Sequence, residues 1–426
     1  MIKTGEKTER ALLVGVDLPH KRIGETEESL DELALLADTA GAEVVERRIQ
    51  TRPSIDPAYF IGRGQTEQLA EDLQGLGVDV LLFDEELSPA QARNIERLTE
   101  GRVVDRTGLI LDIFAQRART KEARIQVELA QLKYLLPRLT RQWAHLSRQS
   151  GGVGRTGGIS MRGPGETQLE TDRRHIRRRI WHLSRALKKV EKERVVQRNR
   201  RSNFFRAALV GYTNAGKSTL LNALAHSEVF VENRLFATLD ATTRLVRLSP
   251  KCRILLTDTV GFIRKLPPSL IASFRSTLEE AIEADLLLHV VDVSHPACEE
   301  HIGVVDETLS ELGIADRPRL LLLNKVDRLK QQGYLVQLRH RYPEAVPISA
   351  EKGYGIEEVR QALYSKVAEH QVVLYLTLPL TEGKLLAHLE HVGDVLERTY
   401  TEKRVTLRIR LAPKEARRLS EHVEKK

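Results

Sequence analysis

Eight residues constrain the fold of this chain more than any others: GYTNAGKS, from Gly211 to Ser218. They follow the apolar run AALV, precede the helical run TLLNALA and fit the spacing G-x-x-x-x-G-K-S. In such a strand, loop and helix unit, backbone N–H groups wrap phosphates, the lysine reaches the β and γ oxygens, and the hydroxyl binds Mg²⁺. The stretch therefore predicts an α/β domain that binds a nucleoside triphosphate.

A second motif lies where the apolar strand RILLTD ends on Asp258 of the sequence DTVG. At this distance from the first motif, the Asp258 carboxylate can hold Mg²⁺ through water, and the Gly261 N–H can meet the γ-phosphate. The pair of motifs therefore indicates a site that senses the terminal phosphate.

A hydroxyl between these motifs can complete the coordination of the metal. The segment FATLD, Phe236–Asp240, supplies Thr238, which we choose, and Thr242 and Thr243 are alternatives. The candidate metal ligands are Ser218 and Thr238. The candidate catalytic residues are Lys217, Gly261 and Thr238.

The base is read by NKVD, Asn324–Asp327, at the end of the strand RLLLLN. The carboxylate of Asp327 can accept from guanine N1–H and the N2 amino group, which adenine lacks, so the expected ligands are GTP and GDP. Ser349–Glu351, after AVPI, lies where a backbone N–H can reach the guanine O6. The candidate nucleotide-binding residues are Gly211, Tyr212, Thr213, Asn214, Ala215, Gly216, Lys217, Ser218, Thr219, Phe236, Ala237, Thr238, Leu239, Asp240, Asp258, Thr259, Val260, Gly261, Asn324, Lys325, Val326, Asp327, Ser349, Ala350 and Glu351.

Phe262 follows DTVG, where Ras-like GTPases carry a glutamine that orients the attacking water. Since a phenylalanine cannot hold water, we expect slow intrinsic hydrolysis. The group that orients the attacking water in place of the glutamine is then another switch residue, a rearranged backbone, a monovalent cation near Asn214, or part of a bound partner. We favour the partner, which raises the rate ~10³–10⁵-fold in some GTPases. Phe262 can also be a core-facing residue.

Positive charge is concentrated between Arg117 and Arg201. This stretch holds 23 basic and 7 acidic residues, a net charge of +16, whereas the whole chain carries only +8. Such an imbalance is typical of a surface that binds a polyanion such as RNA. The alternative is a solvated helix decorated with arginine and lysine.

Two apolar seams run through the basic stretch at steps of 4 and 3 residues. The first runs from Ile125 to Leu146 and the second from Ile176 to Val190. They predict helices over 107–148 and 166–201, paired as an antiparallel hairpin with a turn in the glycine-rich residues 151–168. Pro137 is expected to kink the first helix.

The chain is long enough for several domains, all of them in the α/β or α+β class. We predict a small α/β domain with a mainly parallel sheet at 1–106, the basic hairpin at 107–201, a P-loop GTPase domain at 202–366, and a small α+β domain at 367–426. In the first domain, strands are expected at 11–17, 43–49 and 78–84, and helices at 29–41 and 88–100. The glycine turn at 62–64 is weak as a phosphate site.

Composition excludes several other classes. The two cysteines, Cys252 and Cys298, have no metal-ligand or disulfide spacing, which fits a reducing cytosol. No window approaches the ~20 apolar residues of a membrane span, and the N-terminus carries no signal peptide pattern. We expect a cytoplasmic, unprocessed monomer.

The motifs GYTNAGKSTL, FATLD, DTVGFIR, NKVD and SAE resemble the translation-factor-related class of GTPases. With GRVVDRTGLILDIFAQRA and RGPGETQLETDRR, the chain resembles the HflX family of ribosome-associated GTPases over nearly its whole length. The resemblance implies a bacterial cytosolic enzyme that binds the large ribosomal subunit and its RNA, and that splits or rescues ribosomes under stress.

Two functions are consistent with these features. The first is a GTPase whose turnover times ribosome binding and release. The second is an RNA-binding or RNA-remodelling protein that uses nucleotide mainly as a conformational switch. In the second function, the N-terminal region can also use a second nucleotide, for which the glycine-rich turn is the candidate site. Because the turn lacks a preceding strand and a following Lys-Ser/Thr pair, we favour a flexible RNA-contacting loop.

Overall fold

The structure is a computed structural model that describes residues 8–139, 164–201, 204–225, 235–236, 238–250, 252–265, 267, 275–329, 332–411, 416 and 419. The chain forms two compact units. Unit 1 comprises residues 1–192, 233–240 and 265–276, and unit 2 comprises residues 193–232, 241–264 and 277–426. Among the helices described, none is long and apolar enough to cross a membrane.

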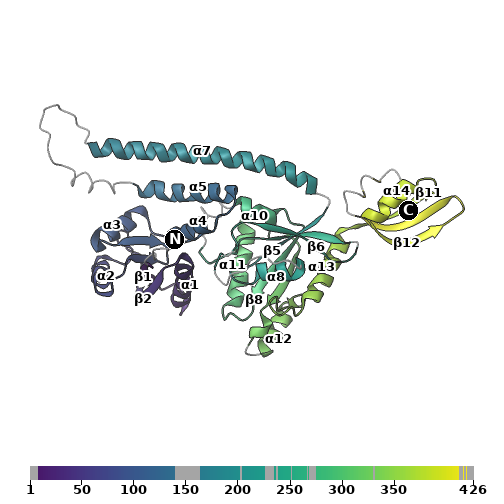
Figure 1. The fold of residues 1–426 in the computed structure, drawn as a ribbon. Coiled ribbons are helices and arrows are strands. Elements are labelled where there is room, and N and C mark those ends of the chain that lie inside the picture. The colour runs from purple at the N-terminus through teal and green to yellow at the C-terminus, as the bar shows by residue number, and fades with distance from the viewer. Residues whose placement is uncertain are drawn as a thin grey trace, which may run out of the picture. The chain divides into compact units, whose positions relative to one another are not determined.

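Unit 1 contains a four-stranded sheet whose strands all run parallel, in the order β2-β1-β3-β4. Its strands are β1 (Arg10–Asp17), β2 (Glu43–Thr51), β3 (Val80–Phe83) and β4 (Arg102–Asp105). The helices between them are α1 (Glu25–Ala40), α2 (Arg63–Leu76) and α3 (Pro89–Thr99), seen in Figure 1. The predicted parallel sheet is confirmed, and β4 is an additional edge strand.

Local signals place the helices of this sheet. Ser88 and Gln91 form a reciprocal capping box, and Pro89 is the first residue of α3. The helix expected at 88–100 therefore begins with two local start signals. Gly62 has φ +91° and precedes α2, a conformation that favours glycine. The glycine turn at 62–64 thus starts a helix.

The basic stretch forms three helices within the described residues: α4 (Arg106–Arg117), α5 (Lys121–Arg138) and α7 (Pro164–Arg201). The prediction of one helix over 107–148 was wrong, because helix α4 ends at Arg117 and a new helix, α5, begins at Lys121. The Thr120 hydroxyl caps α5 by accepting a hydrogen bond from the Ala123 N–H. Pro137 lies in the last turn of α5. Residues 140–163, with most of the predicted turn, lie outside the described residues.

Helices α5 and α7 run side by side in opposite directions (Figure 1), as the predicted hairpin requires. Arg179 of α7 makes two hydrogen bonds to Glu128 of α5, at 2.7 and 3.0 Å. Along the α7 seam Leu183 is buried and Ile176 and Ile180 are partly buried. The 3.5-residue period therefore identified the packed face.

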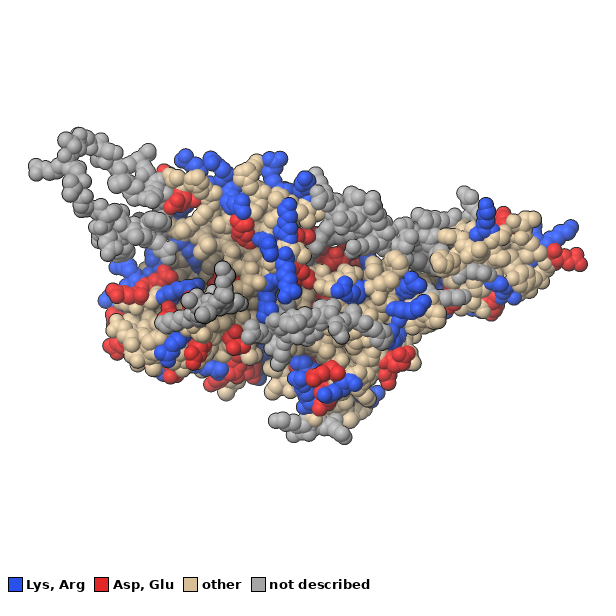
Figure 2. Space-filling model, viewed as in Figure 1, with Lys and Arg blue, Asp and Glu red and all other residues tan. Residues whose placement is uncertain are grey.

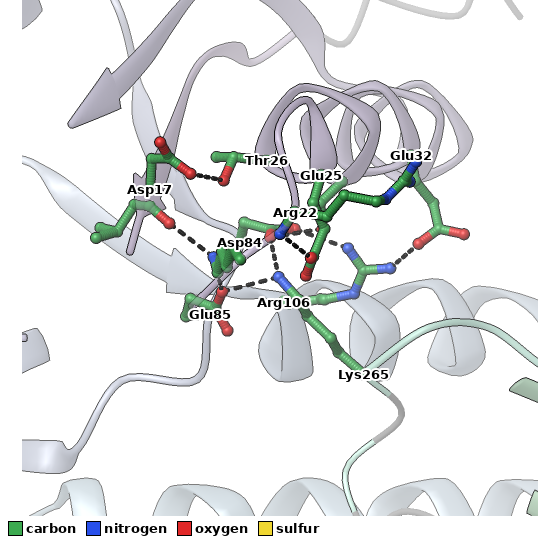
Figure 3. A network of polar contacts seen from close by, with 12 residues as sticks. Asp17, Arg22, Glu25, Thr26, Glu32, Asp84, Glu85, Arg106 and Lys265 are labelled. Carbon is green, nitrogen blue, oxygen red and sulfur yellow. Dashed lines mark hydrogen bonds and ion pairs between the residues drawn. The ribbon is translucent and has the colours of Figure 1, made fainter. Parts of the chain in front are cut away.

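A network of charged side chains lies at the carboxyl end of β3 in unit 1 (Figure 3). Asp84 and Arg106 are almost fully buried and pair at 2.8 Å. Lys265 also contacts Asp84, and it lies 2.8 Å from Glu85. Burial raises the pKa of Asp84, but Arg106 and Lys265 outweigh it and hold that pKa below its usual value. The buried carboxylate therefore stays ionised and partnered.

Unit 2 contains a six-stranded sheet in the order β10-β9-β8-β5-β7-β6, in which only the edge strand β6 is antiparallel. Its strands are β5 (Phe205–Val210), β6 (Thr242–Arg247), β7 (Arg253–Asp258), β8 (Leu286–Asp292), β9 (Arg319–Asn324) and β10 (Val346–Pro347). Its helices are α8 (Lys217–Ala225), α10 (Arg275–Ile282, whose first two residues belong to unit 1), α11 (Cys298–Glu311), the 3-10 helix η2 (Val326–Arg328), α12 (Gln332–Arg341) and α13 (Ile356–His370). This is the predicted P-loop domain.

The last part of unit 2 is an antiparallel sheet in the order β11-β13-β12. It comprises β11 (Val372–Pro379), α14 (Gly383–Val392), β12 (Asp394–Tyr400) and β13 (Arg404–Leu411). The small α+β domain predicted for this part of the chain is confirmed.

His289 of β8 lies inside the six-stranded sheet and is 1% exposed. Neither ring nitrogen has a hydrogen-bond partner among the residues described. Burial, with the positive charges of Arg319 and Lys217, lowers the pKa of His289 to about 3. The folded domain therefore holds this imidazole neutral.

Because the unfolded imidazole has a pKa near ~6.5, the unfolded state binds the extra proton between pH ~6.5 and ~3. The free energy of unfolding therefore falls as pH decreases through that window, by about 2 kcal/mol from pH 7 to pH 5. We expect His289→Leu to remove this part of the acid sensitivity. Hydrogen exchange of the β5 and β8 amides at the two pH values measures it. His340→Gln, at an exposed position of α12, is the control, and equal acid losses in both variants would contradict the prediction.

Candidate functional site

The loop between β5 and α8 has the backbone of a phosphate cradle. Gly211 and Gly216 have φ +149° and +96°, and Asn214 has φ +60°. A Cβ on Gly211 would overlap the Val290 carbonyl oxygen, and one on Gly216 would overlap the Asn324 amide nitrogen. Both glycines are therefore required by conformation and by space.

Lys217 begins α8 and is 6% exposed. Its ammonium donates to the loop carbonyls of Gly211 and Tyr212, at 3.1 and 2.8 Å. Burial lowers the pKa of Lys217 to about 8, against the pull of Asp258 and with a contribution from Lys325. A bound polyanion would favour the charged form of this lysine.

Ser218, in the first turn of α8, lies beside Asp258, the last residue of β7. The Ser218 hydroxyl donates to an Asp258 carboxylate oxygen at 2.6 Å, and Asp258 is 1% exposed. Two hard oxygen ligands side by side fit a Mg²⁺ ion, which binds a hydroxyl directly and a carboxylate directly or through water. The structure thus brings together two residues that the sequence predicted for one site.

Asn324 joins the phosphate loop to the loop after β10. Its amide nitrogen donates to the Ala215 carbonyl at 2.7 Å, and its amide oxygen accepts from the Ala350 N–H at 3.0 Å. Lys325 forms an ion pair with Asp292 at 2.6 Å. The three segments around Ala215, Asn324 and Ala350 therefore form one site.

Asp327 and Glu351 have exposed side chains at this site. Asp327 lies in η2, and Glu351 pairs with Arg328 at 2.8 Å. Ser349 is buried, and its N–H donates to the Tyr354 carbonyl, so the backbone of this loop is closed on itself. An exposed carboxylate beside a structured loop is suited to accept hydrogen bonds from a planar base.

Phe262 has a side chain 1% exposed in the core. Its backbone forms a bridge with the phosphate loop: its N–H donates to the Gly211 carbonyl at 3.1 Å, and its carbonyl accepts from the Thr213 N–H at 2.8 Å. The reading of Phe262 as a core-facing residue is therefore correct, and its ring cannot orient a water.

The predicted switch segment belongs to unit 1. The ring of Phe236 packs edge-on against Phe114 of α4, with centroids 4.7 Å apart. Asp240 accepts from the N–H groups of Arg119 and Thr120 at the start of α5, at 3.0 and 3.1 Å. Thr238 and Leu239 lie between these two anchored residues, and Ala237 lies outside the described residues.

The alternative threonines lie in unit 2. Thr242 and Thr243 begin β6, opposite Asp258 and Thr257. The hydroxyls of Thr243 and Thr257 are 2.9 Å apart. Thr243 is thus engaged in pairing β6 with β7.

Sequence reasoning missed the aromatic support of the phosphate loop. Tyr212 stacks on His301 of α11 with centroids 3.8 Å apart and planes 8° apart. His295 lies against His301 at 4.5 Å. The one signal in the sequence was Tyr212 itself, a large side chain at a position where the motif binds phosphate with backbone N–H groups.

Models of three protein families match most of the chain. The models described as "GTP-binding GTPase N-terminal" and "GTP-binding GTPase Middle Region" match residues 27–115 and 117–201. The model described as "50S ribosome-binding GTPase" matches residues 206–325, which contain the phosphate loop, Asp258 and Asn324.

Curated relatives are similar over the full length. A GTPase HflX of Magnetococcus marinus is 44% identical over 100% of this chain and 98% of its own. A GTPase HflX of Escherichia coli is 44% identical over 92% of both chains. Among solved structures, a GTP-binding protein from Sulfolobus solfataricus in complex with GDP is 26% identical, over 85% of this chain and 99% of its own, with a TM-score of 0.44. The chain is a GTPase and belongs to the HflX family.

Proposed function

We propose that this GTPase binds the large ribosomal subunit and its RNA through α7 and the basic residues around it. GTP hydrolysis times association and release, in the splitting or rescue of ribosomes under stress. The observation that carries the proposal is the distribution of charge on α7. Its basic side chains lie outside the packed seam, and the exposed ones are Arg174, Arg177, Arg178, Arg179, Arg185, Lys188 and Lys189.

Figure 2 supports this assignment, because blue side chains predominate over the described part of α7 along the top of the view. Arg185 lies over the exposed ring of Trp181, at 4.8 Å from its centroid. Arginines and an exposed aromatic ring suit contacts with phosphates and with unstacked bases. The partner that fits this surface is a folded RNA.

The proposed nucleotide roles are supported by the hydrogen bond between Ser218 and Asp258 and by the burial of Lys217 beside the phosphate loop. We assign Lys217 to the β- and γ-phosphates and the Gly261 N–H to the γ-phosphate. Ser218 and Thr238 are the proposed Mg²⁺ ligands, with Asp258 holding the ion through water. The ion, when bound, neutralises charge on the phosphate oxygens.

We assign the base contact to Asp327, with the backbone of Ser349–Glu351 at the guanine O6. This assignment is supported by the exposure of Asp327 and by the Asn324 bonds to Ala215 and Ala350. The two loops thus lie at one site.

Exchanging Asp327 for asparagine tests the base assignment. The amide offers a donor to a base oxygen, so Asp327→Asn should lose at least about a hundredfold in GTP affinity and gain affinity for xanthosine triphosphate. Competition between the two nucleotides measures the shift. The control is Asp316→Asn on the exposed loop before β9. Unchanged preference for guanosine in Asp327→Asn would show that the base is read elsewhere.

Arginines on α7 test the ribosome assignment. Arg179 stays unchanged because it bonds to Glu128 of α5. The variant carries glutamine at Arg173, Arg174, Arg177 and Arg178. Because binding with fewer phosphate contacts releases fewer counterions, affinity for large subunits should fall, and the slope of log K against log salt should decrease in magnitude by about 3. The basal GTPase rate should stay at the parental value.

A matched variant with the same charge change carries glutamine at four exposed positions in the last part of unit 2: Lys384, Arg398, Lys403 and Arg404. It should bind subunits with nearly the parental salt slope. Sedimentation with purified large subunits at several salt concentrations measures both variants, with circular dichroism as a folding control. Parental affinity and slope in the α7 variant would leave α7 as a solvated charged helix.

The second candidate is an RNA-remodelling protein that uses nucleotide mainly as a switch. The buried ring of Phe262 favours this second candidate, because a site without a group that orients the attacking water should hydrolyse GTP slowly. GTP turnover with and without large subunits separates the two. Strong stimulation supports the timed GTPase, whereas RNA binding that depends on nucleotide without stimulated turnover supports the switch.

A further inference from the structure

Tyr212 has a place in the phosphate loop where the motif itself requires no side chain. The tyrosine is 6% exposed, and its hydroxyl accepts from the backbone N–H of Arg264 at 2.9 Å. Arg264 lies two residues beyond Phe262, in the segment that follows the phosphate-sensing DTVG motif. The ring therefore ties the phosphate loop to that segment.

This tie is the third of three hydrogen bonds along one short stretch. Phe262 supplies the other two, to Gly211 and from Thr213. The Arg264 guanidinium also pairs with Glu300 of α11 at 2.5 Å. The backbone from Gly261 to Arg264 is thus held on the phosphate loop at one side and on α11 at the other.

Gly261 lies against the phosphate loop with no room for a side chain. A Cβ at this position would be 2.8 Å from the Thr213 Cα and 2.9 Å from the Lys217 ammonium nitrogen. Lys217 is the cation that the motif directs at the terminal phosphates. The backbone of Gly261, whose position depends on the ties at Phe262 and Arg264, is therefore beside the phosphate position.

His301 supports the ring of Tyr212 from α11. The two planes are 8° apart at a centroid distance of 3.8 Å, so the stack is nearly parallel. Burial, His295 and Arg264 lower the pKa of His301 to about 3, so the imidazole is neutral at physiological pH. A neutral planar ring can stack here without desolvating a charge.

We propose that Tyr212 and His301 are positioning residues for GTP hydrolysis. His301 holds the ring of Tyr212, and the Tyr212 hydroxyl holds the backbone of Gly261–Arg264 so that the Gly261 N–H meets the terminal phosphate. Because Phe262 offers no polar side chain, this chain relies on backbone placement at the point where other GTPases use a glutamine. The inference rests on the proposed role of the Gly261 N–H at the terminal phosphate, and it does not depend on a ribosomal partner.

Two variants break the arrangement at different points. Tyr212→Phe keeps the stack and removes the hydroxyl bond to Arg264, whereas His301→Ala keeps the hydroxyl and removes the stack. Each should lower kcat for basal GTP hydrolysis roughly ten- to hundredfold, because small displacements of a catalytic contact are costly. Affinity for GDP, which lacks the terminal phosphate, should stay within about threefold of the parent.

Two further variants separate positioning from general damage. His301→Phe restores a planar ring and should recover most of kcat. The double variant Tyr212→Phe/His301→Ala should be no slower than the worse single variant, because both act through one hydrogen bond. Glu299→Gln, on the same helix and paired with Arg341 on α12, is the control with parental kcat.

The measurements are single-turnover GTP hydrolysis at saturating nucleotide and GDP binding followed with a fluorescent GDP analogue. A loss of kcat with retained GDP affinity, rescued by His301→Phe, supports the proposal. Parental kcat in His301→Ala would overturn it. So would a loss of GDP affinity in step with kcat, or additive losses in the double variant, since both indicate a structural role for the loop.

Discussion

The parallel direction of β5, β7, β8 and β9 is the constraint on which the catalytic unit depends. The carboxyl ends of parallel strands lie at the same edge of the sheet. Three of these strands end at or just before Gly211, Asp258 and Asn324, so these residues meet at that edge. The side chain of Asn324 then closes the edge by bonding to Ala215 and Ala350. Chemistry at this edge is possible because the sheet places the polar residues before any ligand binds.

Sequence reasoning succeeded where the signal is local. The phosphate loop, Asp258 and Asn324 were predicted because their chemistry requires fixed residue types at fixed spacings beside apolar strands. The apolar seam of α7 was predicted because its 3.5-residue period can be recognised in the sequence without knowing which helix packs against it. Chain direction in the first sheet followed from the alternation of strands and helices.

The errors have physical causes. Residues Arg106–Leu111, Ile113 and Phe114 of α4 are buried, and the break before α5 is only three residues long, so little in the sequence indicated that two helices replace one. Strand β4 has four residues at an edge, too few for an alternating pattern. The stack of Tyr212 on His301 joins residues far apart in sequence, and no local pattern encodes such a contact.

The same physical logic applies to the buried charges of unit 1. Against the effect of burial, Arg106 and Lys265, with a hydrogen bond from Ser29, hold the pKa of Asp84 below its usual value, and removal of one cation from a buried ion pair is costly. Lys265 immediately follows Arg264, whose N–H bonds to the hydroxyl of Tyr212. Two neighbouring residues thus have their polar groups committed, one to a buried carboxylate and one to the phosphate loop. Both residues therefore make specific polar contacts, each within its own unit, although the segment after DTVG has no regular secondary structure.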